Sequence, residues 1–115
     1  MAFTNEQLQE IEKEAAKFMS SRRLPDEIRK ELDYGYRIEG QSIFVYEIRP
    51  QWNDRTIIRH FDFAKTTYVH TKKAWKVYWM RGDLKWYSYD PRPEVKTIAA
   101  FFKLVDEDKW HCFFG

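Results

Sequence analysis

The sequence has little of several residue types on which common classes of small protein depend. Its one cysteine, Cys112, cannot form an internal disulfide, which favours a reducing compartment. Its four glycines are not clustered, so a glycine-rich phosphate-binding loop is excluded. No apolar run approaches the roughly 20 residues that span a bilayer, and no amino-terminal signal pattern is present. We therefore expect a cytoplasmic protein that does not contact membranes.

Side chains that commonly bind metals or catalyse reactions are also scarce. The three histidines are His60, His70 and His111, and no two of them have the spacing of zinc ligands. Cys112 lies in an apolar terminus, where a buried thiol without a neighbouring base is inert. The sequence therefore predicts no metal, no cofactor and no catalytic residue, and it gives little support to an enzyme.

Aromatic residues and positive charge are present in excess. Phe, Trp and Tyr make up 18% of the chain, which predicts an aromatic-rich core in a single domain spanning residues 1–115. The net charge of +2 is uneven: −2 over residues 1–33, +5 over 34–93 and −1 over 94–115. The middle of the chain is thus the basic part, and this distribution points mildly to an anionic partner.

Helical periodicity is confined to the two ends of the chain. Apolar residues recur at helical spacing from Thr4 to Arg22, and Thr4 with Gln7 fits a capping box. A short second helix is predicted from Pro25 to Asp33, so the N-terminal helices cover residues 4–33. The C-terminal segment, residues 91–115, is expected to hold a helix from about Glu94 to Asp106 and an apolar tail docked on the core.

Between these helices, residues 34–90 alternate between apolar and polar side chains and predict an antiparallel sheet. Strands are expected at Tyr34–Glu39, at Ser42–Arg49, which Pro50 ends, and at Thr56–Thr71, which bends near Ala64. Trp52, in the polar loop after Pro50, is expected to fold back on the core. The expected fold is α+β, a meander of about five antiparallel strands with N-terminal and C-terminal helices packed on one face.

Residues Ala74 to Asp90 predict a β-hairpin, because alternating aromatic residues flank Gly82 and Asp83. If these two residues form the loop, Trp79 lies opposite Trp86. The face that needs covering then carries Trp75, Val77, Trp79, Trp86 and Ser88. The other face carries Lys76, Tyr78, Met80, Lys85, Tyr87 and Tyr89.

Several motifs of the chain are distinctive: E-I-R-P at Glu47–Pro50, A-K-T-T-Y at Ala64–Tyr68, the hairpin W-K-V-Y-W-M-R-G-D-L-K-W-Y-S-Y at Trp75–Tyr89, then D-E-D and the closing F-F-G. Together they resemble the motifs of a family of small bacterial proteins catalogued only as a domain of unknown function. The resemblance covers most of the chain from Pro25 onward. It implies a bacterial, single-domain protein and carries no activity, cofactor or site.

The second hairpin face is the best functional candidate, because aromatic rings stack on unpaired bases while Lys and Arg neutralise phosphates. The predicted binding residues are Lys76, Tyr78, Lys85, Tyr87, Tyr89, Arg49 and Arg59, which Arg37 and Lys65 could adjoin. A non-catalytic module that binds single-stranded nucleic acid is therefore the first hypothesis. The simpler interpretation is that helices cover both faces and these tyrosines belong to the core.

Two other functions remain open. The same aromatic patch could bind a protein partner, as an adaptor domain or a homodimer. Alternatively, a pocket between the helices and the sheet, lined by residues such as Trp75, Trp79 and Trp86, could bind a small ligand or catalyse a reaction.

Overall fold

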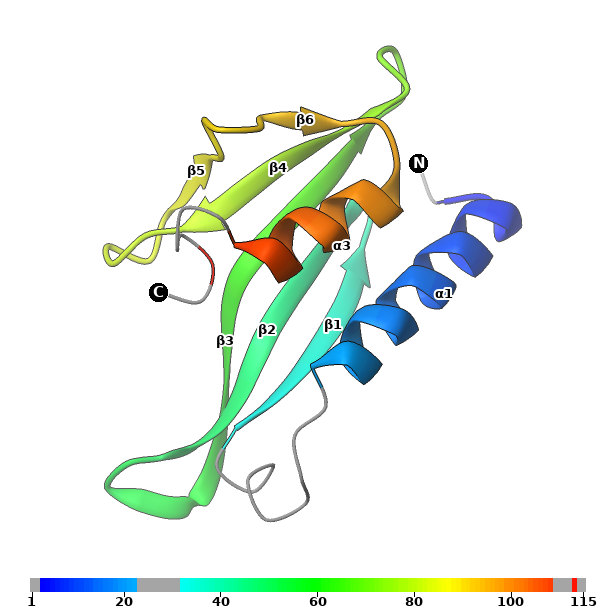
Figure 1. Cartoon of the computed structure of the whole chain (residues 1–115). Helices are drawn as coiled ribbons and strands as arrows, with labels where there is room; N and C mark the ends of the chain where they lie inside the picture. The colour runs from blue at the N-terminus through cyan, green and yellow to red at the C-terminus, as the bar shows by residue number, and fades with distance from the viewer. Residues whose placement is uncertain (1–2, 23–31, 109–112, 114–115) are drawn as a thin grey trace.

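The computed structural model describes residues 3–22, 32–108 and 113. They form the expected α+β meander, with strand order β1-β2-β3-β4-β5 and a short β6 on β4. No described helix is long and apolar enough to span a membrane. The elements are α1 (Asn5–Ser21), β1 (Asp33–Glu39), β2 (Ser42–Gln51), β3 (Asp54–Val69), β4 (Ala74–Met80), β5 (Trp86–Ser88), β6 (Glu94–Val95) and α3 (Ile98–Glu107) (Figure 1).

Helix α1 begins with the capping box predicted from the sequence. The Thr4 hydroxyl accepts the Gln7 backbone N–H at 3.1 Å, and the Gln7 side chain accepts the Thr4 N–H at 2.9 Å. Both of these otherwise unpaired backbone donors are satisfied, which fixes the start of the helix. Most of the second predicted helix falls on residues 23–31, outside the described residues, and Asp33 begins β1 instead.

The C-terminal helix begins later than predicted. Glu94 and Val95 pair with β4 as β6, and Thr97 then caps α3 by accepting the Ala100 N–H at 3.1 Å. The prediction of helix from Glu94 was wrong because a strand pairing and a threonine cap compete with helical periodicity there. Of the apolar tail, Phe113 alone is described; it is buried, with its ring centroid 4.8 Å from that of Tyr89.

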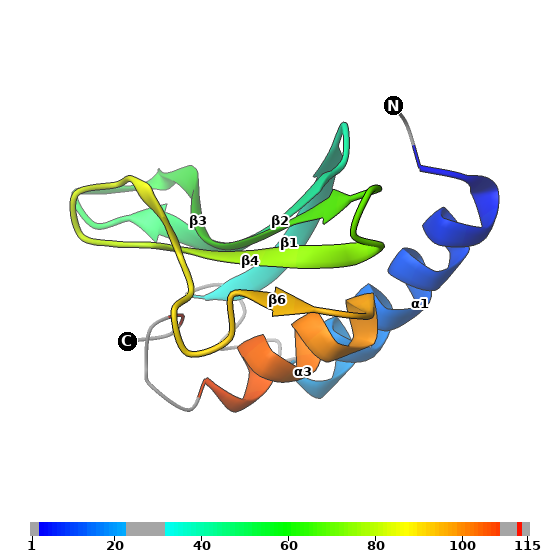
Figure 2. The same cartoon turned by 90° about the horizontal axis from the view of Figure 1, so that it is seen from above.

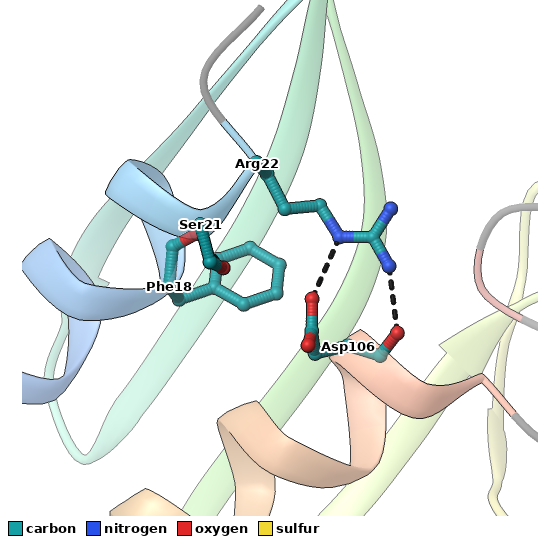
Figure 3. A network of polar contacts seen from close by, with 4 residues as sticks. All are labelled: Phe18, Ser21, Arg22 and Asp106. Carbon is teal, nitrogen blue, oxygen red and sulfur yellow. Dashed lines mark hydrogen bonds and ion pairs between the residues drawn. The ribbon is translucent and has the colours of Figure 1, made fainter.

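The two described helices lie on one side of the sheet, and the core of the described residues lies between these helices and the sheet (Figure 2). Ile11, Ala15 and Phe18 of α1 and four residues of α3 are buried against the inner side chains of the sheet. The two helices also meet directly at their C-terminal ends, where Arg22 Nε donates to Asp106 Oδ1 at 3.0 Å (Figure 3).

The bend predicted near Ala64 is present as a β-bulge in β3. Val45 pairs with Ala64 and the next residue, Tyr46, pairs with Asp62, so Phe63 is the extra residue. Both Phe63 and Ala64 are buried as a result. The bulge thus places two consecutive residues of β3 in the core.

The hairpin register differs from the prediction by one residue. Trp79 pairs with Tyr87 and Met80 with Trp86, so the loop is Arg81–Lys85 rather than Gly82-Asp83. The left-handed residue in this loop is Leu84, with φ 63°, and not Gly82. Because side chains alternate along a strand, a one-residue shift moves every β5 side chain to the opposite face.

Strands β2 and β3 continue beyond the body of the sheet as a two-stranded arm (Figure 1). Pairing with β1 ends at Ile48 and pairing with β4 ends at Ala64, while Arg49 and Pro50 still pair with Arg59 and Ile58. The predictions that Pro50 ends the strand and that Trp52 folds back were wrong. At Pro50, β2 pairs with β3 on one side, and among the described residues no strand pairs with its other side, so the proline interrupts no ladder there. Trp52 at the tip is 90% exposed.

Candidate functional site

The sheet face opposite both helices, here called the outer face, carries aromatic and basic side chains. Register places Phe44 beside Lys65 and Lys65 beside Tyr78, with Met80 and Trp86 paired next to them. The inner positions Val45, Ala64 and Trp79 alternate with these along the same strands. The described residues of the outer face include Arg37, Phe44, Tyr46, His60, Asp62, Lys65, Lys76, Tyr78 and Trp86.

At the centre of the outer face, the Lys65 amine lies among three aromatic rings. Lys65 Nζ is 5.5 Å from the centroid of Phe44, 5.0 Å from Tyr78 and 5.6 Å from Trp86. The rings of Phe44 and Trp86 meet edge to face at 5.9 Å. Cation–π contacts of this kind contribute about 0.5–1 kcal/mol each at exposed sites, so they can hold the amine without a carboxylate partner.

Next to this cluster, Arg37 is held by a carboxylate. Its guanidinium donates to both oxygens of Asp62, at 2.6 and 2.9 Å, and lies 4.3 Å from the centroid of Phe44. The hydrogen bonds with Asp62 raise the pKa of Arg37 above its already high ordinary value. This fork-shaped pair fixes the cation in place, and the negative charge of Asp62 offsets its attraction for another anion.

Farther along β2, Tyr46 lies across a glycine of the neighbouring strand. A Cβ atom at Gly35 would lie 2.6 Å from the Tyr46 ring, so the ring occupies the space that the side chain of any other residue at this position would need. Tyr46 also stacks on His60, with centroids 4.6 Å apart and an interplanar angle of 9°. The aromatic side chains of the outer face therefore extend from Trp86 on β5 to Phe44 and Tyr46 on β2.

On the opposite side of the cluster, a groove of about 590 Å³ carries most of the basic side chains. It is lined by Lys72, Lys76, Tyr78, Ser88, Arg92, Pro93 and Glu94. Lys72 Nζ donates to Glu94 at 3.0 Å, and this hydrogen bond lowers the pKa of Glu94. No carboxylate among the described residues forms an ion pair with Lys65, Lys76 or Arg92.

The structure divides the predicted binding residues of the hairpin between the two faces. Lys76 and Tyr78 lie on the outer face, whereas Tyr87 pairs with Trp79 on the inner side and Tyr89 is 1% exposed in the core. Lys85 is exposed in the loop. The predicted grouping of these five residues on one face was therefore wrong, and the shifted hairpin loop is the cause.

Tyr87 belongs instead to a local network around the hairpin loop. Its hydroxyl donates to Asp83, and the Arg81 guanidinium lies 4.8 Å from its ring centroid. The hydrogen bond lowers the pKa of Asp83 and raises the pKa of Tyr87. This network gives Tyr87 a structural role in the loop.

Arg49 and Arg59 lie apart from the hairpin, directly opposite each other on the arm. The register that pairs Tyr34 with Glu47 and Glu47 with Phe61 places them on the helix side of the sheet. They line a groove of about 670 Å³ together with Glu47, Pro50, Gln51, Trp52 and Phe61. The predicted site thus falls into two separate surfaces.

The predicted binding residues did not include Phe44, Tyr46 and Trp86 of the outer face, or Arg92 of the adjoining groove. The alternation along β2 does place Phe44 and Tyr46 on one side, so these two could have been found from the sequence. Trp86 could not, because its face depends on a left-handed leucine that sequence patterns do not indicate. Arg92 follows a turn whose path is set by the pairing of β6.

Other kinds of site have less support among residues 3–22, 32–108 and 113. No three His, Cys, Asp or Glu side chains of this part gather closely enough to hold a metal ion. The predicted pocket of three tryptophans is not formed, because Trp86 lies on the opposite face from Trp75 and Trp79. A pocket of about 160 Å³ does touch Trp75, but ligand sites usually occupy about 300–1,000 Å³.

A family model matches residues 3–115 of the chain. The chain belongs to the DUF3024 family, a domain of unknown function. Neither a search of curated proteins nor a search of solved structures finds a match. For this DUF3024 chain, inferences about function therefore rest on the two surfaces described above, the outer face and the arm.

Proposed function

We propose that this protein is a non-catalytic module that binds single-stranded nucleic acid on the outer face. The observation that carries the proposal is the cluster of Phe44, Tyr78 and Trp86 around the Lys65 amine, on a face that neither described helix covers. Aromatic rings of this kind stack on unpaired bases, and each stacked base contributes about 1–3 kcal/mol.

The charges support the same ligand. Lys65 lies among the rings, and Lys76 and Arg92 line the groove beside Tyr78. None of the three forms an ion pair with a described carboxylate, so they can neutralise phosphates. Arg37 and Lys72 are already paired with Asp62 and Glu94 and add less. Three such contacts give an expected slope of about −2 for the logarithm of affinity against the logarithm of salt concentration.

A fluorescence titration tests this proposal. An oligonucleotide of about 10 nucleotides, within the site size typical of such modules, is added to the protein at low and at high salt. We expect quenching of tryptophan fluorescence at low salt and weaker binding at high salt. Tyr78→Ala and Phe44→Ala are each expected to weaken binding about ten-fold, because each removes one stacking platform.

Tyr87→Ala is the matched control, since Tyr87 is a tyrosine of the same hairpin on the inner side. It should leave the affinity unchanged. Lys65→Gln should lower the magnitude of the salt slope by about 0.7, the share of one phosphate contact on a single strand. The absence of quenching at low salt, or equal losses for Tyr78→Ala and Tyr87→Ala, would reject the outer face as the site.

A further inference from the structure

The outer face continues past the cluster around Lys65 onto the arm, residues 49–61 (Figure 1). Three pairs of residues on β2 and β3 lie on the same side as Phe44, because side chains two apart on a strand share a face. They are Tyr46 with Asp62, Ile48 with His60, and Pro50 with Ile58. At about 3.3 Å per residue, β2 advances roughly 20 Å from Phe44 to Pro50. The outer face is therefore a strip that runs from the basic groove beside Lys76 to the arm.

At the base of the arm, Tyr46 and His60 form a flat aromatic pair on this strip. Their ring centroids are 4.6 Å apart and their planes differ by 9°. His60 is exposed to solvent, whereas Tyr46 is half-buried. Histidine is one of the side chains on which unpaired bases stack. The exposed member of the pair is thus placed where a base can extend the stack.

The Tyr46 ring is held against the neighbouring strand. It lies over Gly35 of β1, where a Cβ atom would be 2.6 Å from the ring. His60 packs on this ring from β3, so both rings are positioned before any ligand binds. A surface that is ordered in advance loses less conformational entropy on binding, which favours affinity.

The charges beside the aromatic pair are already bonded to each other. Asp62 follows His60 on the same side of β3 and accepts two hydrogen bonds from Arg37, at 2.6 and 2.9 Å. Arg37 Nε also lies 3.3 Å from Glu39. The three pairs of residues that continue the strip contain no lysine or arginine. This end of the outer face can therefore add stacking, but it adds no cation that neutralises phosphates.

We propose that Tyr46 and His60 are a second stacking platform, which binds a further base of a single strand lying along the β-strands. This inference rests on the proposed function, since it assigns the pair to the same ligand. The basic groove and Lys65 neutralise the phosphates, the rings around Lys65 stack the first bases, and the pair at the base of the arm stacks the next. The ligand is therefore a strand long enough to reach from the groove to the arm, and not an isolated nucleotide.

The platform uses only one side of the arm. Phe61 is 46% exposed but pairs with Glu47 on the helix side, away from His60. Arg49 also lies on that side, where it pairs with Glu47 at 2.5 Å. The arm thus offers an exposed aromatic side chain that the proposal leaves out and that can serve as a control.

Titrations with two lengths of oligonucleotide test the platform. They use strands of about 4 and about 10 nucleotides, both within the usual site sizes. The pH is about 8.5, above the range in which histidine side chains ordinarily change charge. His60→Ala should weaken binding of the longer strand about five-fold, the lower end for one stacked base, and that of the shorter strand by less than about two-fold. The shorter strand is less affected because the groove and the rings around Lys65 already occupy it.

Two alanine variants are matched controls for His60→Ala. Phe61→Ala removes the neighbouring exposed ring on the other side of the arm. His70→Ala removes an exposed histidine that contacts Tyr68, whose partner Trp75 is buried on the inner side. Both should leave the affinity for the longer strand unchanged. Circular dichroism of each variant checks that it is folded.

A conservative variant separates stacking from charge. His60→Phe keeps a flat ring on Tyr46 and should retain the affinity that His60→Ala loses. At about pH 8.5, His60→Ala should also leave the salt slope unchanged, whereas Lys65→Gln should lower its magnitude by about 0.7.

The outcomes distinguish the platform from the proposed function. If Tyr78→Ala weakens binding of the longer strand but His60→Ala does not, the outer face stands as the site and the second platform is rejected. An equal loss for both strand lengths in His60→Ala, or an equal loss in Phe61→Ala, would also reject it. No binding of either strand to the unaltered protein at low salt would overturn both proposals.

Discussion

Individual residues determine how close the strands of the outer face can come. Gly35 is on β1, and other residue types could adopt its backbone conformation, since its φ is not in the left-handed region. What requires glycine is the Tyr46 ring, which a Cβ atom would meet at 2.6 Å. A sequence pattern shows only that a glycine interrupts a strand, so the reason for it becomes visible in the structure alone.

Gly35→Ala is expected to destabilise the fold by about 1–3 kcal/mol, the cost of overpacking a filled site. In a Tyr46→Ala background the same change should become neutral or stabilising by up to about 1 kcal/mol, because alanine is less flexible than glycine when unfolded. Urea unfolding of the four proteins of this double-mutant cycle measures both effects. Equal losses in the two backgrounds would show that the ring is not the obstacle.

At the scale of elements, the hairpin β4–β5 decides which aromatic residues reach the outer face. Alternation predicted two strands around Arg81–Asp83 correctly, and it predicted Trp75 and Val77 as core residues. It did not predict the loop, because Leu84 takes the left-handed conformation that the sequence suggested for Gly82. One residue in an unexpected conformation thus exchanged Trp86 with Tyr87 between the faces.

Two tryptophan truncations test this register. Trp75→Ala should cost about 3–5 kcal/mol, since Trp75 is 5% exposed and stacks on Phe3 at 5.5 Å. Trp86→Ala should cost no more than about 1–2 kcal/mol, because its ring packs on the solvent-facing side of the sheet. Thermal or urea unfolding gives both values. Similar losses would favour the predicted two-residue loop, in which both tryptophans face the core.

The hairpin loop also has an expected pH dependence. The hydrogen bond from Tyr87 holds the pKa of Asp83 below its ordinary value, so the stabilisation of the loop is present above the ordinary value and is lost as the pH falls through the folded-state pKa. Tyr87→Phe should therefore raise the pKa of Asp83 toward its ordinary value. NMR titration of the carboxylate measures this, and an unchanged or lower pKa in the variant would contradict it.

At the scale of the whole molecule, the described helices lie on one side of the sheet and leave two surfaces with different chemistry. The α+β class, the meander order and the helices on one face were predictable from periodicity, because two apolar helical stripes and a run of alternating strands have few compact arrangements. The arm was not predictable. Exposed Trp52 and Ile58 follow the same alternation as core residues, and the sequence does not show where β1 and β4 stop pairing.

The most direct test of the central claim uses the tryptophan indole N–H signals in an NMR titration with a single-stranded oligonucleotide. Trp86 lies on the outer face, whereas Trp75 and Trp79 lie on the inner side. Binding on the outer face should shift or broaden the Trp86 signal while those of Trp75 and Trp79 stay in place. Shifts at Trp75 and Trp79 with none at Trp86, or no shift at any of the three at low salt, would contradict the proposed function.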